Sequence, residues 1–161
     1  MENICISLES IEITEMFGIS LGNLSVAGDV ICLDGDLGSG KTTLTQAMAR
    51  GLDVPAENYV TSPSFNIFHE YHGRIPLYHM DFYRLTSSDD VIEMGLDEYF
   101  YLSGLTVIEW AAKAYDILPD KRLSIRLETL DRMARQAICS YSESSWQSRL
   151  HSIEKRMNMT R

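Results

Sequence analysis

Residues 35–42 read Gly-Asp-Leu-Gly-Ser-Gly-Lys-Thr, and the fold is inferred outward from this stretch. Immediately before it, residues 30–33 form a short apolar run, Val-Ile-Cys-Leu, of the kind that is buried on both faces of a parallel sheet. After it, residues 44–52 place apolar side chains at helical intervals, which marks one buried helix face. A strand, a glycine-rich loop and a helix in this order predict a P-loop, whose backbone N–H groups bind phosphate.

The residues of this loop have separate expected roles. Its glycines let the backbone adopt conformations that other residues disfavour, so that N–H groups can point at phosphate oxygens. Lys41, which we expect to be exposed, would place a positive charge near the β- and γ-phosphates, and Thr42 would offer its hydroxyl to Mg²⁺. A plain turn would not require Lys and Thr directly after the last glycine. The expected cofactors are ATP and Mg²⁺, and the predicted nucleotide-binding residues are Gly35, Asp36, Leu37, Gly38, Ser39, Gly40, Lys41, Thr42 and Thr43.

The composition favours one soluble, cytoplasmic domain. The chain has 161 residues, of which 45% are hydrophobic and 23% charged, which is ordinary for a single globular domain. Its net charge of -9 opposes attraction to nucleic acid or anionic lipid, so any role with RNA would run through a partner. The three cysteines lack metal-binding spacing, which fits a reducing compartment. No apolar run approaches the ~20 residues that a membrane span needs, and the first residues do not resemble a signal peptide.

Period-2 and helical patterns extend the prediction to the rest of the chain. We expect a helix over residues 11–24 with Ser10 as its N-cap, and we assign residues 1–141 to a P-loop ATPase domain with 142–161 as its C-terminal helical tail. Predicted strands cover 4–8, 30–33, 65–71, 77–80, 105–108, 121–128 and 135–141, with hairpins joining 65–71 to 77–80 and 121–128 to 135–141. The predicted fold class is α/β and P-loop NTPase-like, with a mainly parallel central sheet, added antiparallel strands and flanking helices.

Two acidic residues follow apolar strands and are candidate catalytic groups. Glu109 ends the strand over 105–108, where the carboxyl edge of a parallel sheet is the expected place for an acid that holds a metal. Asp81 closes the strand over 77–80 and could position water or Mg²⁺ at the same edge. The alternative for Glu109 is a carboxylate that faces solvent at a strand end. The alternative for Asp81 is a residue that serves only to form a turn. We interpret His79, on the same strand as Asp81, as a packed histidine.

Other polar residues carry weaker hypotheses. The hydroxyl-rich loop over 61–64, Thr-Ser-Pro-Ser, could respond to the γ-phosphate as a switch, although Ser and Pro also mark plain turns. Arg132 and Arg135 could bind phosphate, but surface arginines in a hairpin are more common.

Five motifs together resemble one known family in their order and spacing. They are the glycine-rich loop followed by Thr43, Thr-Ser-Pro-Ser-Phe over 61–65, His-Met-Asp-Phe-Tyr-Arg over 79–84, Leu-Asp-Glu-Tyr-Phe over 96–100, and Val-Ile-Glu-Trp over 107–110. This set resembles the TsaE family, the ATPase of the bacterial tRNA threonylcarbamoyladenosine machinery. The resemblance extends from about the first helix to the hairpin near Arg135, and the last twenty or so residues have no evident counterpart.

The resemblance implies a function and a set of partners. It implies feeble, Mg²⁺-dependent ATP hydrolysis within a complex containing the TsaB and TsaD proteins. TsaD would perform the transfer onto tRNA, and hydrolysis by this chain would reset the complex between rounds. This chain would therefore meet tRNA only indirectly.

The resemblance also assigns roles to individual residues. It implies that Lys41 contacts phosphate, that Thr42 and Glu109 hold Mg²⁺, and that Asp81 supports hydrolysis. It further places Trp110 at the functional edge, and Thr14 and Arg132 beside the nucleotide. Departures from the family pattern are Ser39 for alanine, Ser64 for threonine, Ala111 for proline, and Asp131 where glycine often precedes the hairpin arginine.

Three other functions share parts of this pattern. A small-molecule kinase would have the same phosphate loop and could use Asp81 as a base, but no long arginine-bearing lid appears. A GTPase would need an Asn-Lys-x-Asp segment, which is absent. A nucleotide-gated scaffold would bind ATP without turnover, and measuring hydrolysis in the assembled complex would distinguish it from an ATPase.

Overall fold

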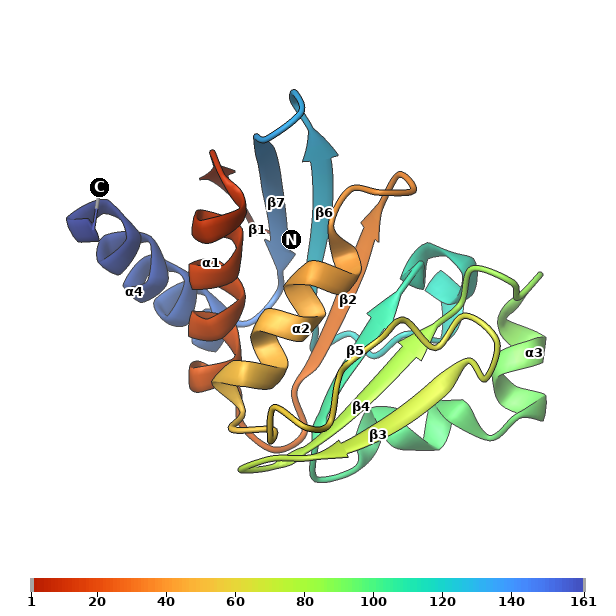
Figure 1. Ribbon diagram of the computed structural model, residues 1–161. Coiled ribbons are helices and arrows are strands. Elements are labelled where there is room, and N and C mark those ends of the chain that lie inside the picture. Colours follow the sequence, from red (N-terminus) through yellow and green to blue (C-terminus); the bar gives the residue numbers. More distant parts are fainter. Residues whose placement is uncertain (1, 161) are drawn as a thin grey trace.

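The chain folds around one seven-stranded sheet (Figure 1). The structure is a computed structural model that describes residues 2–160, so Met1 and Arg161, the outer ends of the predicted segments 1–141 and 142–161, lie outside the described residues. The spatial order is β1-β7-β6-β2-β5-β4-β3. The strands are β1 (Glu2–Leu8), β2 (Val30–Gly35), β3 (Phe68–His72), β4 (Pro76–Asp81), β5 (Leu105–Glu109), β6 (Leu123–Thr129) and β7 (Arg135–Tyr141).

The pairing directions confirm the predicted fold class. β6, β2, β5 and β4 run parallel to one another, whereas β7 and β1 add antiparallel strands at one edge and β3 adds one at the other. The helices are α1 (Ile11–Leu24), α2 (Lys41–Gly51), α3 (Ser88–Glu93) and α4 (Ser144–Thr160), with two 3₁₀ segments, η1 (Leu96–Tyr101) and η2 (Ala111–Ile117). None of the helices within residues 2–160 combines enough length and apolar character to cross a bilayer.

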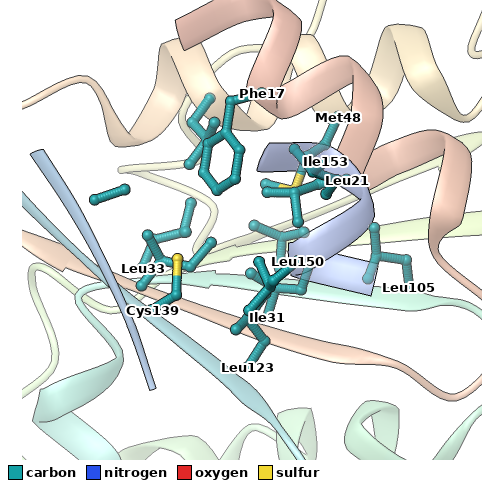
Figure 2. Packing of buried hydrophobic residues seen from close by; sticks show 14 of the residues in the cluster. Phe17, Leu21, Ile31, Leu33, Met48, Leu105, Leu123, Cys139, Leu150 and Ile153 are labelled. Carbon is teal, nitrogen blue, oxygen red and sulfur yellow. The ribbon is translucent and has the colours of Figure 1, made fainter. Parts of the chain in front are cut away.

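Successive side chains of β2 alternate between two hydrophobic cores, one on each face of the sheet. Ile31 and Leu33 join a core formed with α1, α2 and α4, part of which Figure 2 shows. Val30 and Cys32 join a second core, on the opposite face, formed with α3, η1 and η2. β2 is therefore fixed on both sides, which holds the loop at its carboxyl end in a defined position.

Two glycines in α1 allow it to pack closely on α2. A Cβ at Gly18 would lie 2.5 Å from Cβ of Ala47, and one at Gly22 would lie 2.1 Å from the carbonyl oxygen of Met48. Both distances are below any real contact, so only glycine permits this approach. The predicted helix and its cap are confirmed, since Ser10 Oγ accepts from the N–H of Ile13. The glycines, which lower helix propensity, are explained by tertiary packing.

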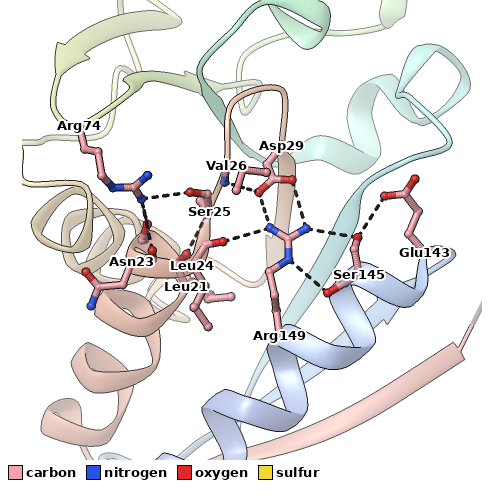
Figure 3. A network of polar contacts seen from close by, with 11 residues as sticks. Leu21, Asn23, Leu24, Ser25, Val26, Asp29, Arg74, Glu143, Ser145 and Arg149 are labelled. Carbon is pink, nitrogen blue, oxygen red and sulfur yellow. Dashed lines mark hydrogen bonds and ion pairs between the residues drawn. The ribbon is translucent and has the colours of Figure 1, made fainter.

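The C-terminal helix α4 packs into the same core as α1. Trp146, Leu150, Ile153 and Met157, which the sequence places at helical intervals, are all buried. Arg149 pairs with both carboxylate oxygens of Asp29, just before β2, at 2.5 and 3.2 Å (Figure 3). The helix is thus joined to the start of the P-loop strand by an ion pair as well as by apolar contacts.

Besides shifts of one or two residues at strand ends, the structure differs from the predicted elements in two respects. β3 begins at Phe68 and not at residue 65, because the N–H of Ile67 bonds the carbonyl of Pro63 and Ile67 adopts a φ of 66°. This turn occupies the residues that we predicted as the first part of the strand. The short segments α3, η1 and η2 were not predicted, since six or seven residues are too few to show a helical period.

Candidate functional site

A cleft of about 480 Å³ opens at the carboxyl ends of β2, β4 and β5. Parallel strands present their carboxyl ends at one edge, which is where ligands bind in open α/β sheets. The cleft is lined by Leu37, Gly38, Gly40, Lys41, Thr42, Thr43, Ser62, Ser64, Asp81, Tyr83, Arg84 and Glu109. A larger trough, of about 730 Å³, lies beside η2 and over β6 and β7, but Lys41, Thr42, Asp81 and Glu109 do not line it.

The loop between β2 and α2 adopts backbone conformations that favour glycine. Gly38 and Gly40 adopt φ values of 79° and 105°, a region that disfavours residues with a side chain. The helix α2 begins directly after Gly40, so its free N–H groups and positive dipole end border the cleft. Of the predicted nucleotide-binding residues on this segment, Leu37, Gly38, Gly40, Lys41, Thr42 and Thr43 line the cleft.

Lys41 is buried, which corrects the expectation of an exposed charge. Only 5% of the residue is exposed, and Nζ donates to the carbonyl oxygens of Gly35 and Asp36 at 2.7 and 2.9 Å. Nζ also lies 4.1 Å from the ring centre of Trp110. Burial lowers the pKa of the Lys41 ammonium, while the carboxylates of Glu109 and neighbouring acids act in the opposite direction. The P-loop therefore fixes its lysine through its own carbonyls.

Glu109 is held beside the loop by two hydrogen bonds. Thr42 Oγ1 donates to Oε2 at 3.1 Å, and His79 Nε2 lies 2.9 Å from Oε1. Glu109 is 2% exposed, so a charged oxygen that faces the cleft is surrounded mostly by protein. A hydroxyl and a carboxylate are hard oxygen donors of the kind that Mg²⁺ prefers, and they fit a site in which phosphates and water supply the other ligands.

Asp81 lies next to Glu109 in the sheet and lines the same cleft. The parallel register of β4 and β5 pairs Asp81 directly with Glu109. One carboxylate oxygen accepts from the N–H of Tyr83 at 2.9 Å, and the other accepts from the hydroxyl of Ser62. Ser62 belongs to the loop that we interpreted as a possible switch. The two predicted catalytic acids therefore lie together, and one of them is bonded to that loop.

Trp110, directly after β5, contacts residues at the ends of two neighbouring strands and the loop lysine. It adopts a left-handed φ of 58°, and its N–H bonds the carbonyl of Leu33 at 2.8 Å. The centre of its ring lies 5.0 Å from the centre of the Tyr83 ring, and Nζ of Lys41 lies over the Trp110 ring. Two residues on, the N–H of Ala112 bonds Asp34, whose pKa is raised by burial. Trp110 thus links three strand ends around the lysine.

The two residues predicted beside the nucleotide on weaker grounds do not line this cleft. Thr14 is buried on α1, where its hydroxyl donates to the carbonyl of Ser10 at 3.0 Å. Arg132 is exposed in the turn between β6 and β7 and does not line the cleft. The arginine that reaches the P-loop is Arg135, whose Nε donates to the carbonyl of Ser39 at 3.2 Å. Contact between the nucleotide and Thr14 or Arg132 stays a prediction.

Sequence reasoning assigned no functional contact to His79. It is fully buried, as we expected of a packed strand histidine, yet its ring bonds the Glu109 carboxylate. Its position two residues before Asp81 was the available signal, because residues i and i+2 of a strand share a face.

Comparison with known proteins identifies the family of this chain. The model of the "Threonylcarbamoyl adenosine biosynthesis protein TsaE" family matches residues 8–137. A tRNA threonylcarbamoyladenosine biosynthesis protein TsaE from Treponema pallidum is 40% identical over 126 residues, which cover 78% of this chain and 91% of that protein. The protein of the same name from Bacillus subtilis is 48% identical over 99 residues, or 61% of this chain and 60% of that protein.

A solved structure is similar over nearly the whole length. The crystal structure of YdiB from Bacillus subtilis superposes with a TM-score of 0.81 and 31% sequence identity, covering 96% of each chain. This similarity extends past residue 137 into the segment for which the sequence suggested no counterpart. The family match and the fold agree, and the chain belongs to the TsaE family of tRNA threonylcarbamoyladenosine biosynthesis proteins.

Proposed function

We propose that this chain binds ATP with Mg²⁺ and hydrolyses it slowly on its own. The observation that carries the proposal is the hydrogen bond between Thr42, directly after the P-loop lysine, and Glu109 at the end of β5. It joins a phosphate-binding loop to a metal-binding acid within one cleft that Asp81 also lines. P-loop ATPases use a hydroxyl and an acid at these positions to hold Mg²⁺.

Each part of the cleft has a chemical role in this proposal. The N–H groups of the loop and of the first turn of α2 bind the phosphates, and Lys41 exchanges its carbonyl partners for phosphate oxygens. Thr42 and Glu109 would hold Mg²⁺, which offsets the charge that develops on the phosphates. Asp81, already oriented by Tyr83 and Ser62, would orient the attacking water and accept its proton.

We propose further that partner proteins control turnover. Asp81 is bonded to the 61–64 loop, so a partner that moves this loop would change the position of the acid. The family's role in tRNA threonylcarbamoyladenosine biosynthesis suggests TsaB and TsaD as these partners, with ATP hydrolysis resetting their complex between rounds. In this proposal the chain acts in the cytoplasm and meets tRNA only through the complex.

Asp81→Asn tests the catalytic part of the proposal. The substitution keeps the shape of the side chain but removes its charge, so ATP binding should persist while hydrolysis stimulated by TsaB and TsaD falls about 10²- to 10⁴-fold. Repeated rounds of tRNA modification should fail in the same variant. Asp89→Asn, at an exposed position on α3, is the matched control and should behave as wild type.

Two results would contradict the proposal. Wild-type hydrolysis in Asp81→Asn would remove Asp81 from the mechanism. Binding of ATP without any turnover, alone or with both partners, would favour the nucleotide-gated scaffold over the ATPase.

A further inference from the structure

His79 lies in β4 with no exposed surface, and its side chain makes one polar contact. Nε2 lies 2.9 Å from Oε1 of Glu109, and the two side chains are 0% and 3% exposed. A carboxylate without a proton only accepts hydrogen bonds, so toward that form of Glu109 the donor is Nε2. The other ring nitrogen, Nδ1, is buried and has no hydrogen-bond partner among the residues that the structure describes.

Packing alone does not explain a histidine at this position. A buried nitrogen without a partner destabilises a fold, and an apolar side chain of similar size would avoid that cost. The register of β4 and β5 places His79 opposite Val107, two residues before Glu109 and therefore on the same face of the sheet. The histidine is thus placed where its one effective hydrogen bond reaches the proposed metal-binding acid.

Both oxygens of Glu109 are held, each by a different element. Thr42 on α2 donates to Oε2, and His79 on β4 is bonded to Oε1. Because each oxygen has its own partner, the plane of the carboxylate is constrained more than it would be by one partner alone. Groups that orient a metal-binding side chain in this way are worth about 10- to 100-fold in metal affinity.

We propose that His79 is a positioning residue that orients Glu109 toward Mg²⁺. The inference rests on the proposed function, because it takes Glu109 to act on the metal. It predicts a specific defect: removing the imidazole should weaken the effect of Mg²⁺ on nucleotide binding and leave metal-free binding unchanged. A histidine that only filled space would alter stability without altering this Mg²⁺ dependence.

The test compares three substitutions in the full chain. His79→Leu removes the donor, and His79→Gln keeps an amide N–H that can extend toward Glu109. His69→Leu is the matched control, because His69 pairs with His79 across β3 and β4 but bonds Tyr71, at 3.2 Å. A fluorescent, non-hydrolysable ATP analogue is titrated at increasing Mg²⁺ and in EDTA. His79→Leu should need about 10- to 100-fold more Mg²⁺ for the half-maximal effect. His79→Gln should lie closer to wild type, and His69→Leu should match it.

The outcomes separate the inference from the function on which it rests. If Mg²⁺ has no effect on binding by the wild-type chain, the proposed function is wrong, and this inference with it. If the wild type responds and His79→Leu responds equally, only the inference is wrong. Should circular dichroism show that His79→Leu does not fold, His79→Asn replaces it, because that amide is too short to reach Glu109. An unchanged Mg²⁺ response in His79→Asn would then overturn the inference.

Discussion

Replacing Arg149 by alanine should loosen the C-terminal helix from the P-loop strand. Arg149 forms a two-bond pair with Asp29, and the two side chains are 15% and 10% exposed. Arg149 also donates to the carbonyl of Leu24 at 3.3 Å. Its Cζ lies 3.5 Å from the centre of the Trp146 ring, over the ring face. The substitution therefore leaves a nearly buried carboxylate whose one remaining donor among residues 2–160 is the N–H of Val26.

The size of the effect follows from this burial. Breaking a buried ion pair by removing one partner costs about 3–5 kcal/mol. The Arg149–Asp29 pair is slightly exposed, and Asp29 keeps the N–H of Val26 as a donor. We therefore expect the free energy of unfolding to fall by about 3 kcal/mol, the lower end of this range. For a chain of this length that corresponds to a fall in Tm of roughly 6–12 °C. Urea denaturation and a thermal scan, both followed by circular dichroism, measure the two quantities.

An exposed arginine supplies the control. Arg126 pairs with Glu128 at 3.6 Å, with side chains 72% and 44% exposed. Surface pairs of this kind contribute little, so Arg126→Ala should change stability by less than about 1 kcal/mol. If Arg149→Ala is no more destabilising than Arg126→Ala, the ion pair does not anchor α4 and the reasoning fails.

Three further perturbations have defined outcomes. Gly22→Ala should destabilise the fold by about 1–3 kcal/mol in urea, because its methyl group would meet the Met48 carbonyl; wild-type stability would contradict this packing. Lys41→Ala should weaken ATP binding in a fluorescence titration, and unchanged affinity would remove the P-loop assignment. Iodoacetamide at pH 8 should modify only Cys5 in the folded chain, since it is exposed and burial raises the pKa of the other two cysteines to about 12. Mass spectrometry of the labelled protein checks this, and three modified cysteines would contradict it.

Local patterns were sufficient for the elements whose signals lie close together in sequence. The helix over 11–24, its cap at Ser10 and the P-loop unit all follow from residues within a few positions of one another. The buried strands were recognised because a short apolar run between acidic or glycine residues is typical of a strand covered on both faces. The short helix α3 was not predicted, although the residues that cap it are also close in sequence: the N–H of Ser87 bonds Asp90, three residues later, as in a capping box.

The candidate site was only partly predictable, because its contacts join residues that are far apart in sequence. Strand ends indicated Asp81 and Glu109, yet nothing local shows that β4 and β5 are neighbours in register. That register brings His79 to Glu109. The same reason explains why Arg132, and not Arg135, was placed beside the nucleotide, since only the hairpin geometry brings Arg135 to the carbonyl of Ser39.

The position of β1 has a consequence for how the chain folds. Among the described residues, 2–8 form their ladder only with residues 135–141, so β1 cannot pair until this distant strand is available. Until then its backbone donors and acceptors are unpaired, and Ile6 and Leu8 lack the core that buries them. Pairings between such distant residues close slowly, because a long loop must be ordered first. Pairing of β1 is therefore a late step of folding, and until it occurs the chain exposes an unpaired strand edge.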